Sequence, residues 1–453
     1  MRRRNFLWLG AAATGAAALG SRMAYASADI RLDPATRFQT MRGWETTLEV
    51  FWTEDFSPFR AEIYDRLITE VGITRLRLEV WSGAENTDRS FENFQSGAID
   101  IQGWRDRRYS TVNDDDDPFH INWAGFDFAN LDWRVEQHLL PILERARVHG
   151  QKMEINFTYV AFTKQIKIGE YVHTNPEEYA EFILASFLHL RDKYGIVPDS
   201  FEPILEPDNV PQWNPQLFGQ AVAAATRRLD HAGFHPRVVL PSVTDIHKLI
   251  PWMKEIIKVP GAMDGVRELS YHRYHGGEIA LLQKIAALAK TLGLETAMLE
   301  YWGGKGVYPL LHNDLKYADV TVWQGRSALS HHHIDTSRPA GQQLVLNEDV
   351  RFDRLYYAAI RPGAVRIGAA TSNAKAADPV AFVTPEGGMA VVLRLDKAAS
   401  VAVHDLPAGD YLLETAYGGG GTTAPVSFHA DGAQPFVTDL PGPGVISIRP
   451  DRR

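Results

Sequence analysis

The sequence contains no cysteine among its 453 residues. This absence excludes disulfides, thiolate metal ligands and a cysteine nucleophile. The apolar run at the N-terminus, Leu7 to Leu19, is too short and too rich in alanine and glycine to span a membrane. The chain also lacks a block of basic residues and has a formal net charge of −9, which argues against nucleic acid as a partner.

The N-terminus has the pattern of an export signal. Arg3-Arg4-Asn5-Phe6-Leu7 is a twin-arginine pattern, and Ala24-Tyr25-Ala26 fits a cleavage site of small residues. We therefore predict that residues 1–26 are a removable twin-arginine signal peptide. Its removal takes away four arginines and no acid, so the net charge falls from −9 to −13. We expect a periplasmic or secreted protein without stable membrane insertion after cleavage.

From Trp44 onward, strand-like and helix-like segments alternate. The run Ile73–Trp81 alternates as a strand does, and Asn175-Pro176-Glu177-Glu178 has the composition of a helix cap. Eight such units, the second with a long connection over residues 82–130, predict an α/β fold, a (β/α)₈ TIM barrel over residues 41–362. Pro203 lies within the expected strand that ends at Glu206, where proline cannot donate a hydrogen bond, so we expect a bulge or a late start there.

After Pro362-Gly363 the pattern changes. Short alternating runs such as Met389–Leu395 are separated by turns rich in glycine, proline and aspartate. This pattern predicts an antiparallel β-sandwich over residues 363–453, appended to the barrel.

Two glutamates end apolar, strand-like runs. Glu206 closes Ser200-Phe-Glu-Pro-Ile-Leu-Glu and Glu300 closes Thr296-Ala-Met-Leu-Glu, and a loop follows each. The carboxyl ends of barrel strands meet at one rim, where chemistry is sited. A carboxylate pair at that rim is the minimum needed to cleave a glycosidic bond, so we predict Glu206 and Glu300 as the catalytic residues. The alternative for either residue alone is an ion-paired glutamate without a catalytic role.

Other polar and aromatic residues at strand ends are candidates for binding a substrate. A positive charge such as Arg77 could keep an attacking carboxylate ionised, although an ordinary ion pair of the barrel is an alternative. Aromatic side chains are suited to stacking on sugar rings, and any single tryptophan could equally belong to the core. These candidates are Trp44, Glu45, Arg77, Trp81, His272, Tyr274, Trp302 and Trp323.

Two segments resemble metal sites. The acidic run Asp114–Asp117 could hold calcium, although such runs are more often solvated loops. His331-His332-His333 could suggest zinc, but adjacent histidines of a strand point to opposite faces. We therefore predict no metal site, and keep a metal-dependent hydrolase as an alternative.

Short motifs along the mature chain resemble the clan A glycoside hydrolases, most of all family 30, the glucosylceramidase/xylanase type. The resemblance implies a carbohydrate substrate, with Glu206 as acid/base and Glu300 as nucleophile. It also implies cleavage of a β-linked glycan or glycoside by double displacement without a cofactor, and a strand over residues 27–40 that joins the sandwich. The motifs are Gly43-Trp44, Glu206-Pro207, His272–His275, Glu300-Tyr301-Trp302, Trp323-Gln324 and the passage from Tyr356-Tyr357 to Ile360-Arg361-Pro362-Gly363-Ala364.

One position departs from the resemblance. Enzymes of this clan usually carry asparagine before the acid/base glutamate, where it donates to the 2-hydroxyl of the sugar, and this chain has Leu205. Asn156, Asn209 or His272 could supply the donor instead, or the substrate is unusual at that carbon. Leu205 also keeps open an alternative function, a glycan-binding protein that has lost turnover.

Overall fold

The computed structural model describes residues 25–48, 56–302 and 307–451. The predicted signal peptide lies outside these residues as far as residue 24, and so do Phe51 and Trp52 of the first predicted strand. Within the described ranges, no helix combines the length and the apolar character that crossing a bilayer requires.

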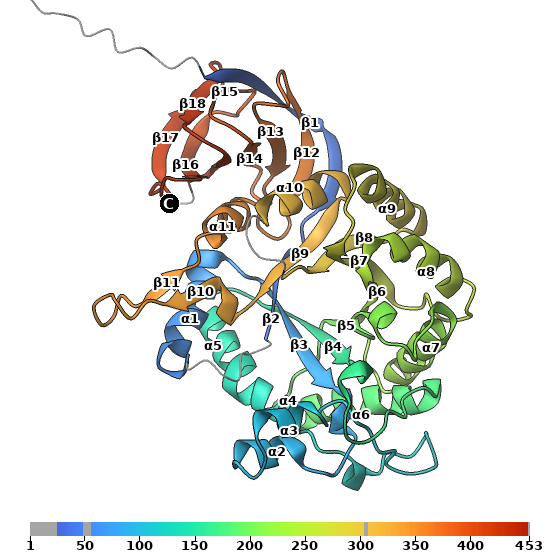
Figure 1. Ribbon diagram of the computed structural model, residues 1–453. Coiled ribbons are helices and arrows are strands. Elements are labelled where there is room, and N and C mark those ends of the chain that lie inside the picture. Colours follow the sequence, from blue (N-terminus) through green and yellow to red (C-terminus); the bar gives the residue numbers. More distant parts are fainter. Residues whose placement is uncertain (1–24, 49–55, 303–306, 452–453) are drawn as a thin grey trace, which may run out of the picture.

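Eight parallel strands close into a barrel, with helices around it (Figure 1). This confirms the predicted TIM barrel. The barrel strands are β2 (Gly43–Thr47), β3 (Arg75–Trp81), β4 (Glu154–Val160), β5 (Ser200–Glu202), β6 (Arg237–Asp245), β7 (Val266–His275), β8 (Glu295–Glu300) and β9 (Val320–Ser327).

Two of the surrounding helices begin at asparagine caps that the sequence shows, Asn175 and Asn214. The side chain of Asn175 accepts a hydrogen bond from the backbone N–H of Glu177, and Gly195 ends the same helix in the left-handed conformation. A π-helical turn, Val135–Leu139, separates two of these helices. The helices are α1 (Arg60–Arg66), α4 (Ala129–Arg134), α5 (Leu140–Val148), α6 (Pro176–Tyr194), α7 (Pro215–His231), α8 (Leu249–Ile256), α9 (Ile279–Leu292), α10 (Tyr308–Tyr317) and α11 (Val350–Ala359).

The prediction of a strand that ends at Glu206 is wrong, because β5 stops at Glu202. Pro203 has no N–H with which to continue the ladder, so strand pairing ends at the residue before it. The bulge or late start expected there is in fact an early end. Ile204 and Leu205 therefore lie outside the strand, and Glu206 reaches the barrel rim on an irregular segment.

The long connection between β3 and α4 is more ordered than the sequence suggests. It contains two short helices, α2 (Ser90–Gln95) and α3 (Ile101–Arg105), which lie beside α4 in Figure 1. A second insertion follows β9 and forms the hairpin of β10 (His332–Ile334) and β11 (Leu344–Leu346). The sequence analysis assigned no structure to this hairpin, which includes His332 and His333 of the histidine run.

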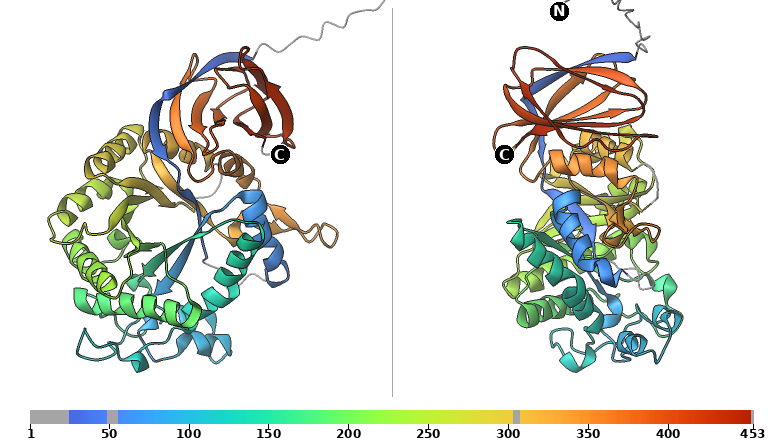
Figure 2. Two further views of the ribbon diagram at one scale, coloured as in Figure 1. Left: turned by 180° about the vertical axis from the view of Figure 1, so that it is seen from behind. Right: turned by 90° about the vertical axis from the view of Figure 1, so that its left-hand side faces the viewer.

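A separate sheet of nine strands packs on one side of the barrel, next to α10 and α11 (Figures 1 and 2). This confirms the appended β-sandwich. The N-terminal strand β1 (Ala26–Thr40) pairs with β12 in antiparallel and with β15 in parallel orientation. The other strands are β12 (Val365–Thr371), β13 (Asp378–Val383), β14 (Met389–Leu395), β15 (Ala399–His404), β16 (Gly409–Tyr417), β17 (Val426–Ala430), β18 (Phe436–Leu440) and β19 (Gly444–Pro450).

The sheet shares a hydrophobic core with the barrel. Val380, Phe382 and Val392 belong to the same buried cluster as the helix-facing side chains of the barrel strands and α11, whereas Val391 and Leu393 pack within the sandwich itself. At the same junction the side chain of Asp378 forms ion pairs with Lys316 of α10 and with Arg394 of β14. The sandwich therefore covers an apolar face of the barrel.

We predict that Val392→Asp prevents accumulation of soluble protein or lowers the melting temperature by more than about 10 °C, because an unpaired carboxylate would be buried at this junction. Val437→Asp is the matched control, since Val437 lies in the same sheet and is 61% exposed. Thermal unfolding of both variants measures the difference. Equal effects would show that the barrel does not depend on the sandwich.

Candidate active site

Charged residues of β3 point into the barrel. Because side chains alternate along a strand, Arg75, Arg77 and Glu79 share one face, while Leu76 and Leu78 pack outward against the helices. All three charged residues are at least 99% buried. Buried charges need partners of opposite sign, so the two arginines determine where carboxylates gather inside the barrel.

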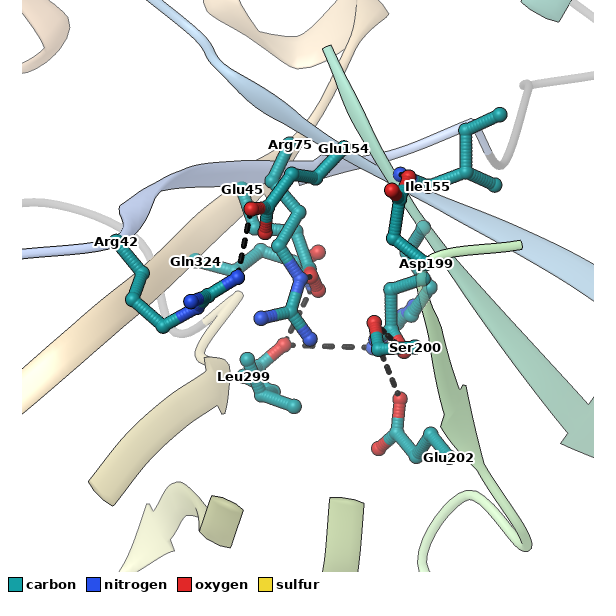
Figure 3. A network of polar contacts seen from close by, with 12 residues as sticks. Arg42, Glu45, Arg75, Glu154, Ile155, Asp199, Ser200, Glu202, Leu299 and Gln324 are labelled. Atoms are coloured by element: carbon teal, nitrogen blue, oxygen red, sulfur yellow. Dashed lines mark hydrogen bonds and ion pairs between the residues drawn. The ribbon is translucent and has the colours of Figure 1, made fainter. Parts of the chain in front are cut away.

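Arg75 organises the end of the barrel at which the strands begin. Its guanidinium lies 2.6 Å from Glu45 and 2.8 Å from Glu268. Figure 3 shows Arg75 and Glu45 together with Arg42 and Glu154, and the last two side chains are 2.6 Å apart. Burial raises the pKa of Glu45 to about 7, although the charge of Arg75 opposes the shift. These residues form a structural network.

Arg77 holds Glu300 at the opposite end. Nη2 of Arg77 lies 2.5 Å from Oε2 of Glu300, the last residue of β8. The hydroxyl of Tyr274 donates to Oε1 of Glu300 at 2.7 Å. Burial and the charge of Glu300 raise the pKa of Tyr274, so this phenol keeps its proton as a donor. A carboxylate with a guanidinium on one oxygen and a phenol on the other is fixed in orientation.

Glu206 is held in a different environment. Its backbone adopts the left-handed conformation with φ 52°, which costs energy for a residue other than glycine and recurs at functional sites. Oε1 of Glu206 lies 2.9 Å from Nδ1 of His272, and the amide of Asn209 donates to Oε2 at 3.4 Å. His272 faces Glu300 across the register of β7 and β8, which brings the two glutamates to the same place.

Glu206, His272 and Glu300 each contribute an atom to a group in which all atoms lie within 4.8 Å of one another. Burial raises the pKa of Glu206, but the hydrogen bond and the charge of His272 outweigh it and hold the pKa below its ordinary value. Burial alone would lower the pKa of His272. The hydrogen bond with Glu206 and the charges of Glu300 and Glu206 raise it by more, so the pKa lies above its ordinary value. The pair of Glu206 and His272 therefore retains one proton next to Glu300.

An apolar cluster of aromatic residues stands beside Glu206. Leu205 packs in it with Trp81, Trp104 and Tyr109, and the rings of Trp81 and Trp104 stack at a centroid distance of 5.4 Å. Leu205 is 3% exposed and therefore has a packing role. Trp302, by contrast, is 37% exposed and stands two residues after Glu300, where a ligand can reach its ring.

Some sequence candidates lie elsewhere. Trp44 and Trp323 are fully buried outside the barrel wall, where their indole N–H groups donate to the Ile360 carbonyl and to Asp314, respectively. They are packing residues, and the stacking role predicted for them needs correction. Both side chains point outward because β2 and β9 place them on the helix-facing side, a choice that the sequence does not reveal.

Asn156 and Glu45 also lie below the rim. The amide of Asn156 is 3.3 Å from Glu202 and its carbonyl accepts from Ser200, so the side chain is already engaged within the barrel. Glu45 is engaged by Arg75. The structure thus brings Arg77, Asn209, His272 and Tyr274 to the two glutamates, and leaves Asn156 and Glu45 apart from them.

Sequence reasoning missed Glu79 and Glu202. Oε1 of Glu79 lies 3.1 Å from Arg77, and Oε1 of Glu202 lies 4.0 Å from Nε2 of His272. Both residues support side chains that contact Glu300 and Glu206. Glu79 could have been found from the sequence, because it alternates with Arg75 and Arg77 along one strand.

The described residues contain two groups with the spacing of metal ligands, and neither includes the histidine run. The first is Glu206, His272 and Glu300, but the guanidinium of Arg77 already lies against Glu300 at 2.5 Å. A second cation at that carboxylate would be repelled, so this trio fits proton transfer better than metal binding. The other group is Asp114, Glu178 and Glu181.

Comparison with known proteins gives similarity at the level of structure. No protein-family model matches the chain, and no curated protein matches its sequence. Among solved structures, a GH30 endoxylanase from Clostridium papyrosolvens C71 superposes with a TM-score of 0.64 at 15% identity, covering 93% of this chain and 99% of that one. The catalytic domain of GH30 xylanase C from Talaromyces cellulolyticus gives 0.64 at 14% identity, over 93% and 99%. An endo-β-1,6-glucanase gives 0.61 at 15% identity, over 92% and 94%. The chain therefore has the fold of the clan A glycoside hydrolases of family 30, as the sequence motifs indicate.

Proposed function

We propose that this protein is a retaining glycoside hydrolase that cleaves a β-linked glycan or glycoside by double displacement. The observation that carries the proposal is the spacing of Glu206 and Glu300, which place carboxylate oxygens within 4.8 Å of each other. Retaining enzymes hold their two carboxyl groups about 5–5.5 Å apart, whereas inverting enzymes need about 6.5–9.5 Å to admit water. The glycosidases of the same fold add support.

The environments of the two glutamates suit two different roles. The carboxylate of Glu300, held by Arg77 and Tyr274, attacks the anomeric carbon. Glu206 receives the proton of the pair from His272 along their 2.9 Å hydrogen bond and gives it to the departing glycosidic oxygen, which leaves Glu206 as a carboxylate. The bond from the anomeric carbon to the leaving oxygen breaks as the bond to Glu300 forms.

The second displacement reverses these roles. Glu206, now a carboxylate, takes a proton from water, and the water oxygen attacks the anomeric carbon. The ester bond to Glu300 breaks and its carboxylate returns to Arg77. Because the carbon is inverted twice, the product keeps the configuration of the substrate. A glycan-binding protein without turnover would not need this matched pair, so catalysis is the better interpretation.

We predict that Glu300→Gln lowers kcat for aryl β-glycosides by at least about 10³-fold, because the amide cannot attack the anomeric carbon. Glu300→Ala should recover part of its turnover in azide and release a glycosyl azide of inverted configuration. Glu278→Gln is a matched control that removes an exposed glutamate at the start of α9. A Glu300→Ala enzyme with full activity would end the proposal.

We also predict that the effect of Glu206→Gln depends on the leaving group. For substrates with a poor leaving group, loss of general acid catalysis should lower kcat/KM by about 10²–10⁴-fold. For a dinitrophenyl glycoside, which leaves without protonation, the first displacement should be nearly unaffected. Rate constants from a series of aryl leaving groups give this dependence, and a uniform loss across the series would argue against Glu206 as the acid.

Asn209 is the best-placed donor for the substrate's 2-hydroxyl. Asn156 is engaged by Glu202, and His272 by Glu206, whereas Asn209 is partly exposed with its amide 3.4 Å from Glu206. We predict that Asn209→Ala lowers kcat/KM by about 10- to 100-fold on an aryl β-glucoside, the loss of one strong hydrogen bond. The 2-deoxy analogue should show little change. Equal losses on both substrates would assign Asn209 another role.

A further inference from the structure

Three carboxylates converge far from the barrel axis. Asp114 comes from the long connection after β3, and Glu178 and Glu181 lie three residues apart on α6, so they project from the same side of that helix. One oxygen of each residue lies within 4.8 Å of an oxygen of the others. The group therefore joins an excursion of the chain to a helix of the barrel.

Two of the three carboxylates have a buried oxygen without a hydrogen-bond partner among the described residues. Glu181 is 2% exposed, and its Oε1 accepts no hydrogen bond there; Oε2 of Glu178 is likewise buried without a donor. The neighbouring basic side chains already have other partners, because Arg228 pairs with Glu177 at 2.9 Å and His173 contacts Glu85 at 2.6 Å. A buried carboxylate without a partner is costly, so something must balance the group.

We propose that Asp114, Glu178 and Glu181 bind a Ca²⁺ ion. The donors are all oxygen atoms, which hard cations prefer, and none is a nitrogen or sulfur atom of the kind that selects zinc. The side-chain oxygen of Asn113 is also buried without a donor and is adjacent in sequence. The backbone N–H groups of Asn122 and Asp115 hold the Asp114 carboxylate in place at 2.6 Å and 3.0 Å.

Only the first residue of the acidic run takes part. Asp115 pairs with His120 at 2.7 Å, and Asp116 and Asp117 are exposed. The site thus differs from the calcium loop that the run alone suggests, because two of its ligands come from α6. Such a site requires the folded chain.

The bound ion would stabilise the rim of the barrel. The backbone N–H of Asp114 donates to Glu85, which contacts His173, and His173 lies 2.8 Å from the hydroxyl of Tyr159. The carbonyl of Tyr159 in turn accepts from the N–H of Leu205, the residue before Glu206. The proposed site is structural and independent of the proposed hydrolysis, since no substrate atom needs to reach it.

The test measures calcium binding to the full mature chain. Bound metal is first removed with a chelator, and the chelator is then removed as well. Titration calorimetry with CaCl₂ should show one site with a dissociation constant between about 10 µM and 1 mM. At a hundredfold excess over that constant, the melting temperature should rise by about 2–5 °C. Glu181→Gln and Asp114→Asn should each weaken binding by at least about 10-fold.

Asp116→Asn is the matched control, since it removes one charge from the same run and leaves the three ligands intact. Its affinity for calcium should equal that of the unchanged protein. Glu181→Gln should fold without calcium, because an amide replaces a buried carboxyl group of the same shape. The proposal is overturned if millimolar calcium produces neither heat nor a thermal shift. It is equally overturned if Asp116→Asn weakens binding as much as Asp114→Asn does.

Discussion

The site depends on one electrostatic constraint, the burial of two arginines of β3 along the barrel axis. Neither guanidinium can be left without an anion, because the cost of removing a charge from water far exceeds what packing returns. Arg75 draws Glu45 and Glu268 at one end of the barrel, and Arg77 draws Glu79 and Glu300 toward the other. The carboxylate proposed as nucleophile is therefore positioned by the same pairing that makes the barrel interior stable.

The second glutamate is placed by different means. Pro203 ends β5 early, and the chain after it reaches Glu206 in a left-handed conformation that an ordinary strand would not produce. This geometry is held by packing, since Leu205 is buried in the aromatic cluster that the β3–α4 connection supplies. One glutamate thus stands on a rigid strand and its counterpart on a strained segment supported by an insertion. This arrangement is typical of barrel proteins, in which a rigid set of strands positions loops that carry functional residues.

A buried carboxylate needs a partner that balances its charge, and this requirement applies both to the glutamates inside the barrel and to the acidic group at α6. In the barrel, each buried glutamate has an arginine, a histidine or a hydrogen-bond donor within reach. At α6, Oε2 of Glu178 and Oε1 of Glu181 have no hydrogen-bond partner among the described residues, because other glutamates already engage the nearby Arg228 and His173. The contrast is what favours a bound cation at α6 and proton transfer at the barrel rim.

The sequence by itself determined the fold, because the order of strands and helices follows from local periodicity and from caps such as Asn175-Pro176, which need no tertiary information. It also singled out Glu206 and Glu300, because both end apolar runs, and the structure brings these two residues together. It could not tell which face of β2 and β9 points outward, so Trp44 and Trp323 were assigned to the site although they pack beneath α11 and against α10. It did not reveal that Glu79 and Glu202 support the pair, or that Asp114 meets α6. Those facts depend on contacts between residues far apart in the chain, and only the tertiary structure, by burying charges that must then find partners, decided them.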